Sequence, residues 1–189
     1  GLLTAFLFFR ACQTTFFIIF HAPINADAGF YLSTARALAH GDEIYKTIFS
    51  PYTPVGTFLI SLLYPAADHL IDPYLMPILM IAASHIIVSF LVYILLRKNG
   101  VEPLAAAFTS VLCYNLCLRC EGDAILLESF TMIFGLLALL FFIEGENRAS
   151  ASDMFIAGAA AAVCFLCKQY GLAVMVILTL LAINSHPFR

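Results

Sequence analysis

The sequence predicts an all-α, polytopic membrane helical bundle from its composition, its apolar runs and the placement of its charges. Of its 189 residues, 62% are hydrophobic and only 11% are charged, and the mean hydropathy is +0.97. A typical soluble domain is about 45–50% apolar and about 25% charged, so this chain has too few polar side chains to cover a water-soluble globule. The same figures exclude a disordered chain and a disulfide-stapled secreted module, and a net charge of −3 gives no reason to expect nucleic acid as a partner.

Apolar runs divide the chain, 1–189, into about six expected membrane spans that form a single transmembrane module. A spanning helix needs about 20 mostly apolar residues. The run 74–96 has no charged side chain and is followed at once by Arg97 and Lys98. Some of the other runs are short and need flanking residues or tilt to cross a bilayer. The expected spans are 2–20, 74–96, 104–118, 125–143, 154–167 and 172–183.

A long external loop, 21–72, separates the first two spans, and we expect it to contain helices that lie along the membrane surface. Asn25 or Asp27 is suited to cap a mixed, Ala-rich helix, and Gly41 is suited to end it. A second short helix is expected after Pro54, because proline is tolerated in the first turn of a helix.

The segment 47–67 leaves two topologies open, because it is uncharged but interrupted by prolines. Lys and Arg concentrate in cytoplasmic loops. If this segment does not span, the basic turns at 97–100 and 144–153 share one side, and Asp27 lies opposite with the acidic turn at 121–123. If it does span, the first basic turn moves to the outside. We therefore expect six spans and a short interfacial helix.

The cysteines are expected to be packing residues. All six lie within or at the edge of apolar runs, and the Cys164–Cys167 pair has no second ligand pair nearby. Zinc and redox sites need several ligands or an accessible thiolate, whereas a buried free cysteine behaves as a small apolar residue.

Asp27 is a candidate for chemistry because it stands just past the first span, on the expected external side. It is either a simple helix cap or a general base placed above the bilayer. Tyr31 lies one helical turn further on, and either fixes a polar ligand or packs.

A second polar group joins the third and fourth spans on the same expected side. Arg119, Glu121 and Asp123 lie in a short turn that would need some charge in any case. Glu128 follows within an apolar helix, where an ionisable side chain costs at least about 2.5–3.5 kcal/mol near the centre and less near an end. This cost makes Glu128 a candidate site residue.

Lys168 interrupts an apolar run at the expected outer end of the fifth span. A terminal lysine commonly extends its ammonium to the membrane surface without further function. An ammonium at headgroup depth is also a natural partner for a lipid phosphate. Both interpretations stay open on the residues alone.

The order of these residues resembles the GT-C class of membrane glycosyltransferases. Asp27 is followed by a Tyr-Leu-x-x-Ala-x-x-Leu-x-x-Gly pattern at 31–41, then by Tyr45, by Ser-Pro-Tyr-Thr-Pro at 50–54 and by Lys-Gln-Tyr-Gly at 168–171. The pattern is most similar to the protein-mannosyltransferase-like branch, which includes the lipid A aminoarabinose transferases. The resemblance implies an N-terminal part of a longer enzyme, with a site on the extracytoplasmic face of a bacterial inner membrane.

Such enzymes transfer a sugar from a polyprenyl-phosphate donor to a lipid, glycan or protein acceptor. The resemblance implies that Asp27 is the catalytic base and that Lys168 meets the carrier phosphate, helped by Arg119 and Tyr31. It further implies an acidic second-loop site, in some members with a divalent metal such as Mg²⁺, Mn²⁺ or Zn²⁺. The matching acidic residues here are Glu121 and Asp123, with Glu128 nearby. The adjacent acidic pair common in the family is absent, since Asp27 is followed by Ala28.

The chemistry agrees with this assignment. Glycosyl transfer passes through an oxocarbenium-like transition state, and a carboxylate that takes the acceptor's proton leads to inversion at the sugar carbon. Two other classes stay open. A transporter or flippase would show inverted repeats or paired broken helices, and neither is evident. A non-catalytic membrane subunit would keep the activity of its complex after Asp27→Asn.

Overall fold

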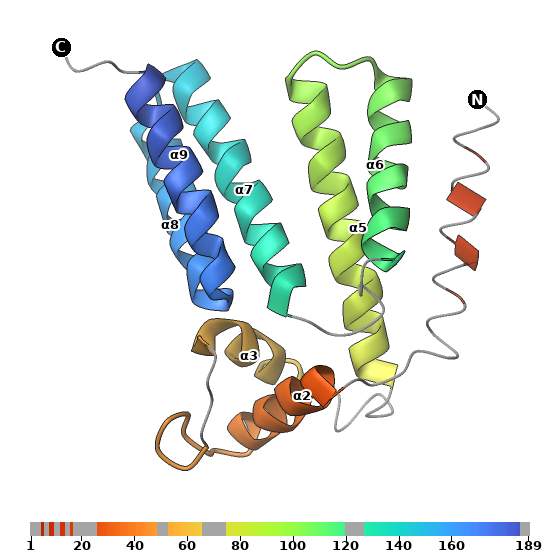
Figure 1. Ribbon diagram of the computed structural model, residues 1–189, viewed down its shortest axis with the longest axis vertical. Helices are drawn as coiled ribbons and strands as arrows, with labels where there is room; N and C mark the ends of the chain where they lie inside the picture. The colour runs from red at the N-terminus through yellow and green to blue at the C-terminus, as the bar shows by residue number, and fades with distance from the viewer. Residues whose placement is uncertain are drawn as a thin grey trace.

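The computed structural model describes residues 26–48, 53–65, 75–119 and 127–185, together with residues 5, 8, 9, 12, 13 and 16. In these residues the chain is all-helical and forms no strand, as the sequence predicts (Figure 1). The elements are α2 (Ala26–Ala39), α3 (Pro54–Ser61), α5 (Leu75–Lys98), α6 (Pro103–Arg119), α7 (Leu127–Arg148), α8 (Ala151–Cys167), the 3₁₀ helix η1 (Gln169–Gly171) and α9 (Leu172–Ser185).

Helices α5 to α9 run up and down beside one another, with consecutive helices antiparallel (Figure 1). Their positions follow the apolar runs of the sequence to within a few residues. One described helix, α7, is long and apolar enough to cross a membrane by length and composition, and α6, α8 and the stretch through α9 contain shorter apolar helices. The expected first span, 2–20, lies largely outside the described residues.

Small side chains bring α7, α8 and α9 together. Ala138 of α7 and Ala157 and Ala161 of α8 are buried, and they pack in one cluster with Phe142 and Leu178. Alanine at a helix contact lets two backbones approach closely.

Ion pairs join the ends of α5 and α7 at one end of the bundle. The Lys98 ammonium contacts the Glu144 carboxylate, and Arg148 Nε lies 3.0 Å from the other oxygen of Glu144. The two basic turns, at 97–100 and 144–153, therefore share one end of the bundle, which is the arrangement that a non-spanning segment 47–67 predicts.

The opposite end is covered by α2 and α3, which lie across it (Figure 1). Tyr31 of α2, Ile60 of α3, Met76 of α5 and Leu127 of α7 are buried in one core cluster, so both short helices are packed onto the bundle. With eight residues, α3 is about 12 Å long, far less than the ~30 Å needed to span a bilayer. The described part of segment 47–67 is thus a short helix at the end of the bundle.

The start of α2 differs from one of the two caps that the sequence offers. The helix begins at Ala26, so Asp27 lies in its first turn and is not the residue that caps it. The alternative cap, Asn25, lies outside the described residues. The end is as expected, because Gly41 takes a positive φ of 100° just after the helix.

Candidate functional site

Lys168 lies in the tight turn between α8 and α9, at the end of the bundle that α2 and α3 cover (Figure 1). Its backbone is extended, with φ −158° and ψ 145°, and it caps the C-terminus of α8. Its side chain is only 12% exposed. A cation beside the last carbonyls of a helix is stabilised by the helix dipole. The turn therefore holds a largely buried ammonium in a fixed place.

The partner of this ammonium is Glu128, in the first turn of α7. Lys168 Nζ donates to Glu128 Oε1, and the ring of Tyr170 lies 5.4 Å from the same ammonium. Each charge also lies at the favourable end of its own helix, the carboxylate at an N-terminus and the ammonium at a C-terminus. The sequence marks both residues as candidates, and the structure pairs them with each other.

Only half of the Glu128 carboxylate is satisfied within the described residues. Oε1 accepts from Lys168, whereas Oε2 is a buried atom with no hydrogen-bond partner there. A buried oxygen without a donor costs about 1–3 kcal/mol, and more if it is charged. The side chain as a whole is nevertheless 38% exposed, so part of it faces outward.

The first turn of α3 lies beside Lys168. A Cβ on Gly56 would lie 3.3 Å from the carbonyl oxygen of Cys167 and 2.8 Å from Leu127 Cδ2. Thr53, the N-cap of α3, has a buried hydroxyl with no hydrogen-bond partner in the described part of the chain. Neither Thr53 nor Gly56 is a candidate on the sequence alone. The Thr-Pro pair at a helix start was the available signal.

Asp27 is exposed at the start of α2, at the same end of the bundle (Figure 1). Tyr31, one turn later, has an exposed fraction of 1% and packs in the core cluster. For Tyr31 the structure therefore supports the packing alternative, and contact between Tyr31 and the lipid-linked sugar donor stays a prediction. Asp27 presents its carboxylate outward, as a residue that meets an acceptor must.

The remaining predicted residues lie at or beyond the edge of the described segments. Arg119 is the last residue of α6, and its side chain lies outside the described part, as do Glu121 and Asp123. No group of three His, Cys, Asp or Glu side chains gathers among the residues that the structure describes. Of the three predicted acidic residues, Glu128 alone is described, and its neighbour is an ammonium and not a second acid.

The cysteines of α8 are fully buried. Cys164 and Cys167 each have an exposed fraction of 0%. The Cys164 thiol donates to the carbonyl of Thr131 on α7 at 3.2 Å, so it lies in the contact between the two helices.

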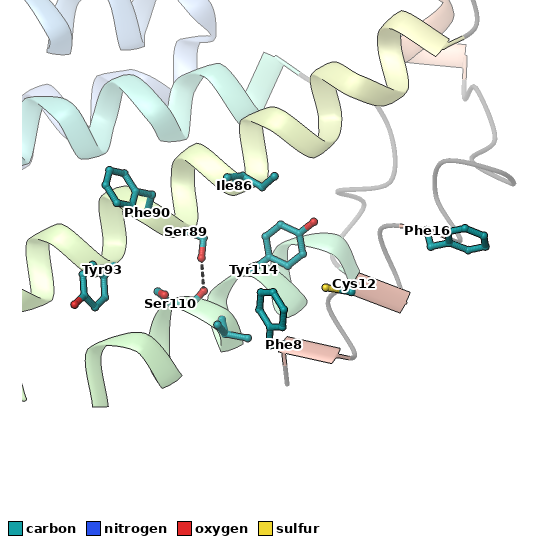
Figure 2. Close-up of a pocket in the computed structure, with 10 residues that line it drawn as sticks. Phe8, Cys12, Phe16, Ile86, Ser89, Phe90, Tyr93, Ser110 and Tyr114 are labelled. Atoms are coloured by element: carbon teal, nitrogen blue, oxygen red, sulfur yellow. Dashed lines mark hydrogen bonds between the residues drawn. The ribbon is translucent and has the colours of Figure 1, made fainter. Parts of the chain in front are cut away.

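A cavity of about 590 Å³ lies away from Lys168, between α5, α6 and the N-terminal residues Phe8, Cys12 and Phe16 (Figure 2). Its walls are mainly apolar and aromatic, and the Ser89 hydroxyl donates to the Ser110 carbonyl across it at 2.7 Å. Of the predicted site residues whose side chains the structure describes, Asp27, Tyr31, Glu128 and Lys168, none lines this cavity.

Comparison with known proteins found no matching family model, curated protein or solved structure. The chemistry assigned to the site therefore rests on its own residues.

The arrangement suits binding of an anion at one position and removal of a proton at another. A largely buried ammonium attracts an anion more strongly than one in water, because the local dielectric is lower. The exposed Asp27 carboxylate is an acceptor for a hydroxyl proton.

Proposed function

We propose that this chain belongs to a membrane glycosyltransferase that moves a sugar from a polyprenyl-phosphate donor to an acceptor hydroxyl. The observation that supports this most is the placement of Lys168, a largely buried cation in a rigid turn at the end of the bundle that also carries Asp27. A lipid-linked phosphate brings an anion to the depth of the headgroups, where such a cation can meet it.

Lys168 holds the phosphate of the donor. As the bond between the sugar and the phosphate breaks, negative charge grows on the leaving phosphate, and a nearby ammonium stabilises that charge in the transition state. Tyr170 lies over the ammonium and limits its contact with water, which strengthens the attraction. The prenyl tail stays in the lipid while the sugar extends toward water.

Asp27 takes the proton of the acceptor hydroxyl. The carboxylate is exposed on the first turn of α2, so a water-borne acceptor can approach it. A base on the acceptor side and a leaving group on the other side give inversion at the sugar carbon. The core contacts of Tyr31 fix the helix that carries this base.

In this proposal Lys168 binds the phosphate and Asp27 takes the proton, and neither step uses a divalent metal. Of the acidic residues proposed to hold one, Glu128 is paired with Lys168, and Glu121 and Asp123 lie outside the described residues.

The proposed setting is a polytopic bundle of about six spans in a bacterial inner membrane, with α2 and α3 on the extracytoplasmic surface. The apolar composition and the long apolar helix α7 support it. The basic turns at the far end of the bundle support the orientation, because basic residues favour the cytoplasmic side.

The test is transfer of a labelled sugar from a polyprenyl phosphate by the complete protein in proteoliposomes. We expect Asp27→Asn to lower kcat by about a hundredfold or more, because loss of a general base typically costs that much, with KM for the donor little changed. Asp42→Asn is the matched control, since Asp42 is an exposed acid in the loop that follows α2, and it should keep wild-type rates.

Wild-type transfer by Asp27→Asn would remove Asp27 from the reaction. Absence of transfer from every lipid-linked sugar tried, by a protein shown to be folded, would contradict the proposed function. Vectorial movement of the lipid without transfer would favour a flippase instead.

A further inference from the structure

Lys168, the residue proposed to bind the donor phosphate, is paired with Glu128. An ammonium that binds phosphate already has a carboxylate in contact with it. A carboxylate and a phosphate carry like charge and seek the same donors. Both anions cannot bind this one cation at close range without repelling each other.

We infer that Glu128 is an exchangeable counter-ion: it holds Lys168 in place in the empty protein and is displaced from the ammonium by the incoming phosphate. This inference rests on the proposed function. It makes Glu128 a positioning residue that sets donor affinity through Lys168, in place of a member of the acidic second-loop or metal site that the resemblance implies.

The exposure of the two side chains favours movement of Glu128 and not of Lys168. The lysine is 12% exposed, and Tyr170 lies over its ammonium, so it is enclosed where it stands. The glutamate is 38% exposed and can rotate outward without unpacking a helix. The backbone of Lys168 is also fixed, because the turn to α9 is tight.

The hydrogen bonding of the carboxylate favours exchange as well. Glu128 Oε2 is buried and has no donor among the described residues, so the paired state is only half satisfied. Rotation toward water hydrates both oxygens and removes that penalty. The free energy recovered in this way opposes the loss of the ion pair, which keeps the two states close in stability.

A structural ion pair at the other end of α7 provides a matched comparison. Glu144 pairs with Lys98 and Arg148, and Glu144 is 15% exposed. Both of its oxygens have a cationic partner, one lysine and one arginine. Glu144→Gln is therefore the same substitution on the same helix, at a carboxylate that no phosphate is proposed to replace.

The experiment measures binding of farnesyl phosphate, a short prenyl phosphate, to the complete protein in nanodiscs. Farnesol and inorganic phosphate serve as separate probes, so the lipid and the phosphate contributions are distinguished. Removal of a competing ion pair strengthens binding by up to about tenfold per 1.4 kcal/mol of pair energy. We expect Glu128→Gln to bind farnesyl phosphate about fivefold more tightly than wild type, and Glu144→Gln to bind it as wild type does.

A double-mutant cycle tests whether the effect acts through Lys168. Lys168→Met should abolish the phosphate-dependent part of binding, and adding Glu128→Gln to it should then change nothing. In the transfer assay, Glu128→Gln should lower KM for the donor without raising kcat, because the carrier phosphate leaves more slowly. If Glu128 had a purely structural role, Glu128→Gln would change the thermal stability and would not lower KM at an unraised kcat.

Equal or weaker binding of farnesyl phosphate by Glu128→Gln would overturn the inference. If that variant does not fold, Glu128→Asp replaces it: its carboxylate reaches less far, and binding should tighten about twofold, whereas no tightening overturns the inference. Wild-type binding of farnesyl phosphate no stronger than of farnesol would overturn it too. If Glu128→Gln binds farnesyl phosphate more tightly but the protein transfers no sugar, the proposed function is contradicted and the counter-ion role of Glu128 is supported.

Discussion

Gly171 lies directly against the main chain of Cys164. A Cβ at position 171 would lie 2.4 Å from the carbonyl carbon of Cys164 and 2.5 Å from its oxygen. Gly171 is buried, and its N–H donates to the Lys168 carbonyl at 2.9 Å. The absence of a side chain at this one position is what allows α9 to turn back against the end of α8, and this turn carries Lys168.

Gly171→Ala is therefore expected to destabilise the protein by about 2–4 kcal/mol, since the clash is with backbone that cannot rotate away. The measurement is the thermal unfolding midpoint in detergent. Gly158→Ala is the control, because a Cβ at that position of α8 meets nothing within 4 Å. It should stabilise the helix by about 0.5–1 kcal/mol. Similar midpoints for the two variants would contradict the packing described for Gly171.

The loop between α5 and α6 contains a carboxylate whose ionisation is coupled to folding. Hydrogen bonds from the backbone N–H groups of Leu104 and Ala105 lower the pKa of Glu102, and the bond from Ala105 measures 3.0 Å. A lowered pKa in the folded state means that ionised Glu102 stabilises the fold. This contribution is fully present above the pKa of the unfolded chain and is lost as pH falls through the lower, folded value.

The Glu102→Gln variant tests this coupling, because its amide cannot ionise. Thermal midpoints measured from about pH 7 down to about pH 3 should fall more steeply for the wild type than for the variant, and the two curves should converge at the acid end. Carboxyl chemical shifts in NMR give the pKa of Glu102 directly. A titration at or above the ordinary glutamate value would show that the helix start does not hold the charged form.

The helices could be predicted from the sequence because their cause is local. A continuous apolar run followed by Arg97 and Lys98 defines α5, and Pro54 opens α3 as expected for a proline in the first turn. Caps are harder to predict, as Asp27 illustrates: its residue type suits the cap position, but the helix already includes Ala26.

The pairing of Lys168 with Glu128 could not be predicted in this way. The two residues are 40 positions apart, so no local spacing pattern relates them. Their contact depends on how α7 and α8 pack, and the buried Cys164 and the small residues of α8 lie in that interface. The sequence marks Glu128 and Lys168 as candidates because each is an ionisable residue in or beside an apolar run. Which of the candidates contact each other depends on tertiary packing.

Gly56 controls how closely α3 approaches the end of α8 that carries Lys168. A Cβ there would lie 2.8 Å from Leu127 Cδ2 and 3.3 Å from the Cys167 carbonyl oxygen. Gly56→Ala should therefore cost about 1–3 kcal/mol in a thermal unfolding experiment. Leu127 has an exposed fraction of 0%, so Leu127→Ala should cost about 2–5 kcal/mol by leaving a cavity.

The double variant separates a packing clash from an effect on α3 itself. Leu127→Ala removes the atom nearest to the new Cβ at position 56. The new methyl group also fills part of the cavity that Leu127→Ala leaves. The double variant should then lose less stability than the sum of the two single losses, by about 1 kcal/mol or more. Additive costs would mean that Leu127 is not the obstacle that the new Cβ meets. In that case the contact that brings α3 against α7 and beside Lys168 would contribute little to the stability of the site.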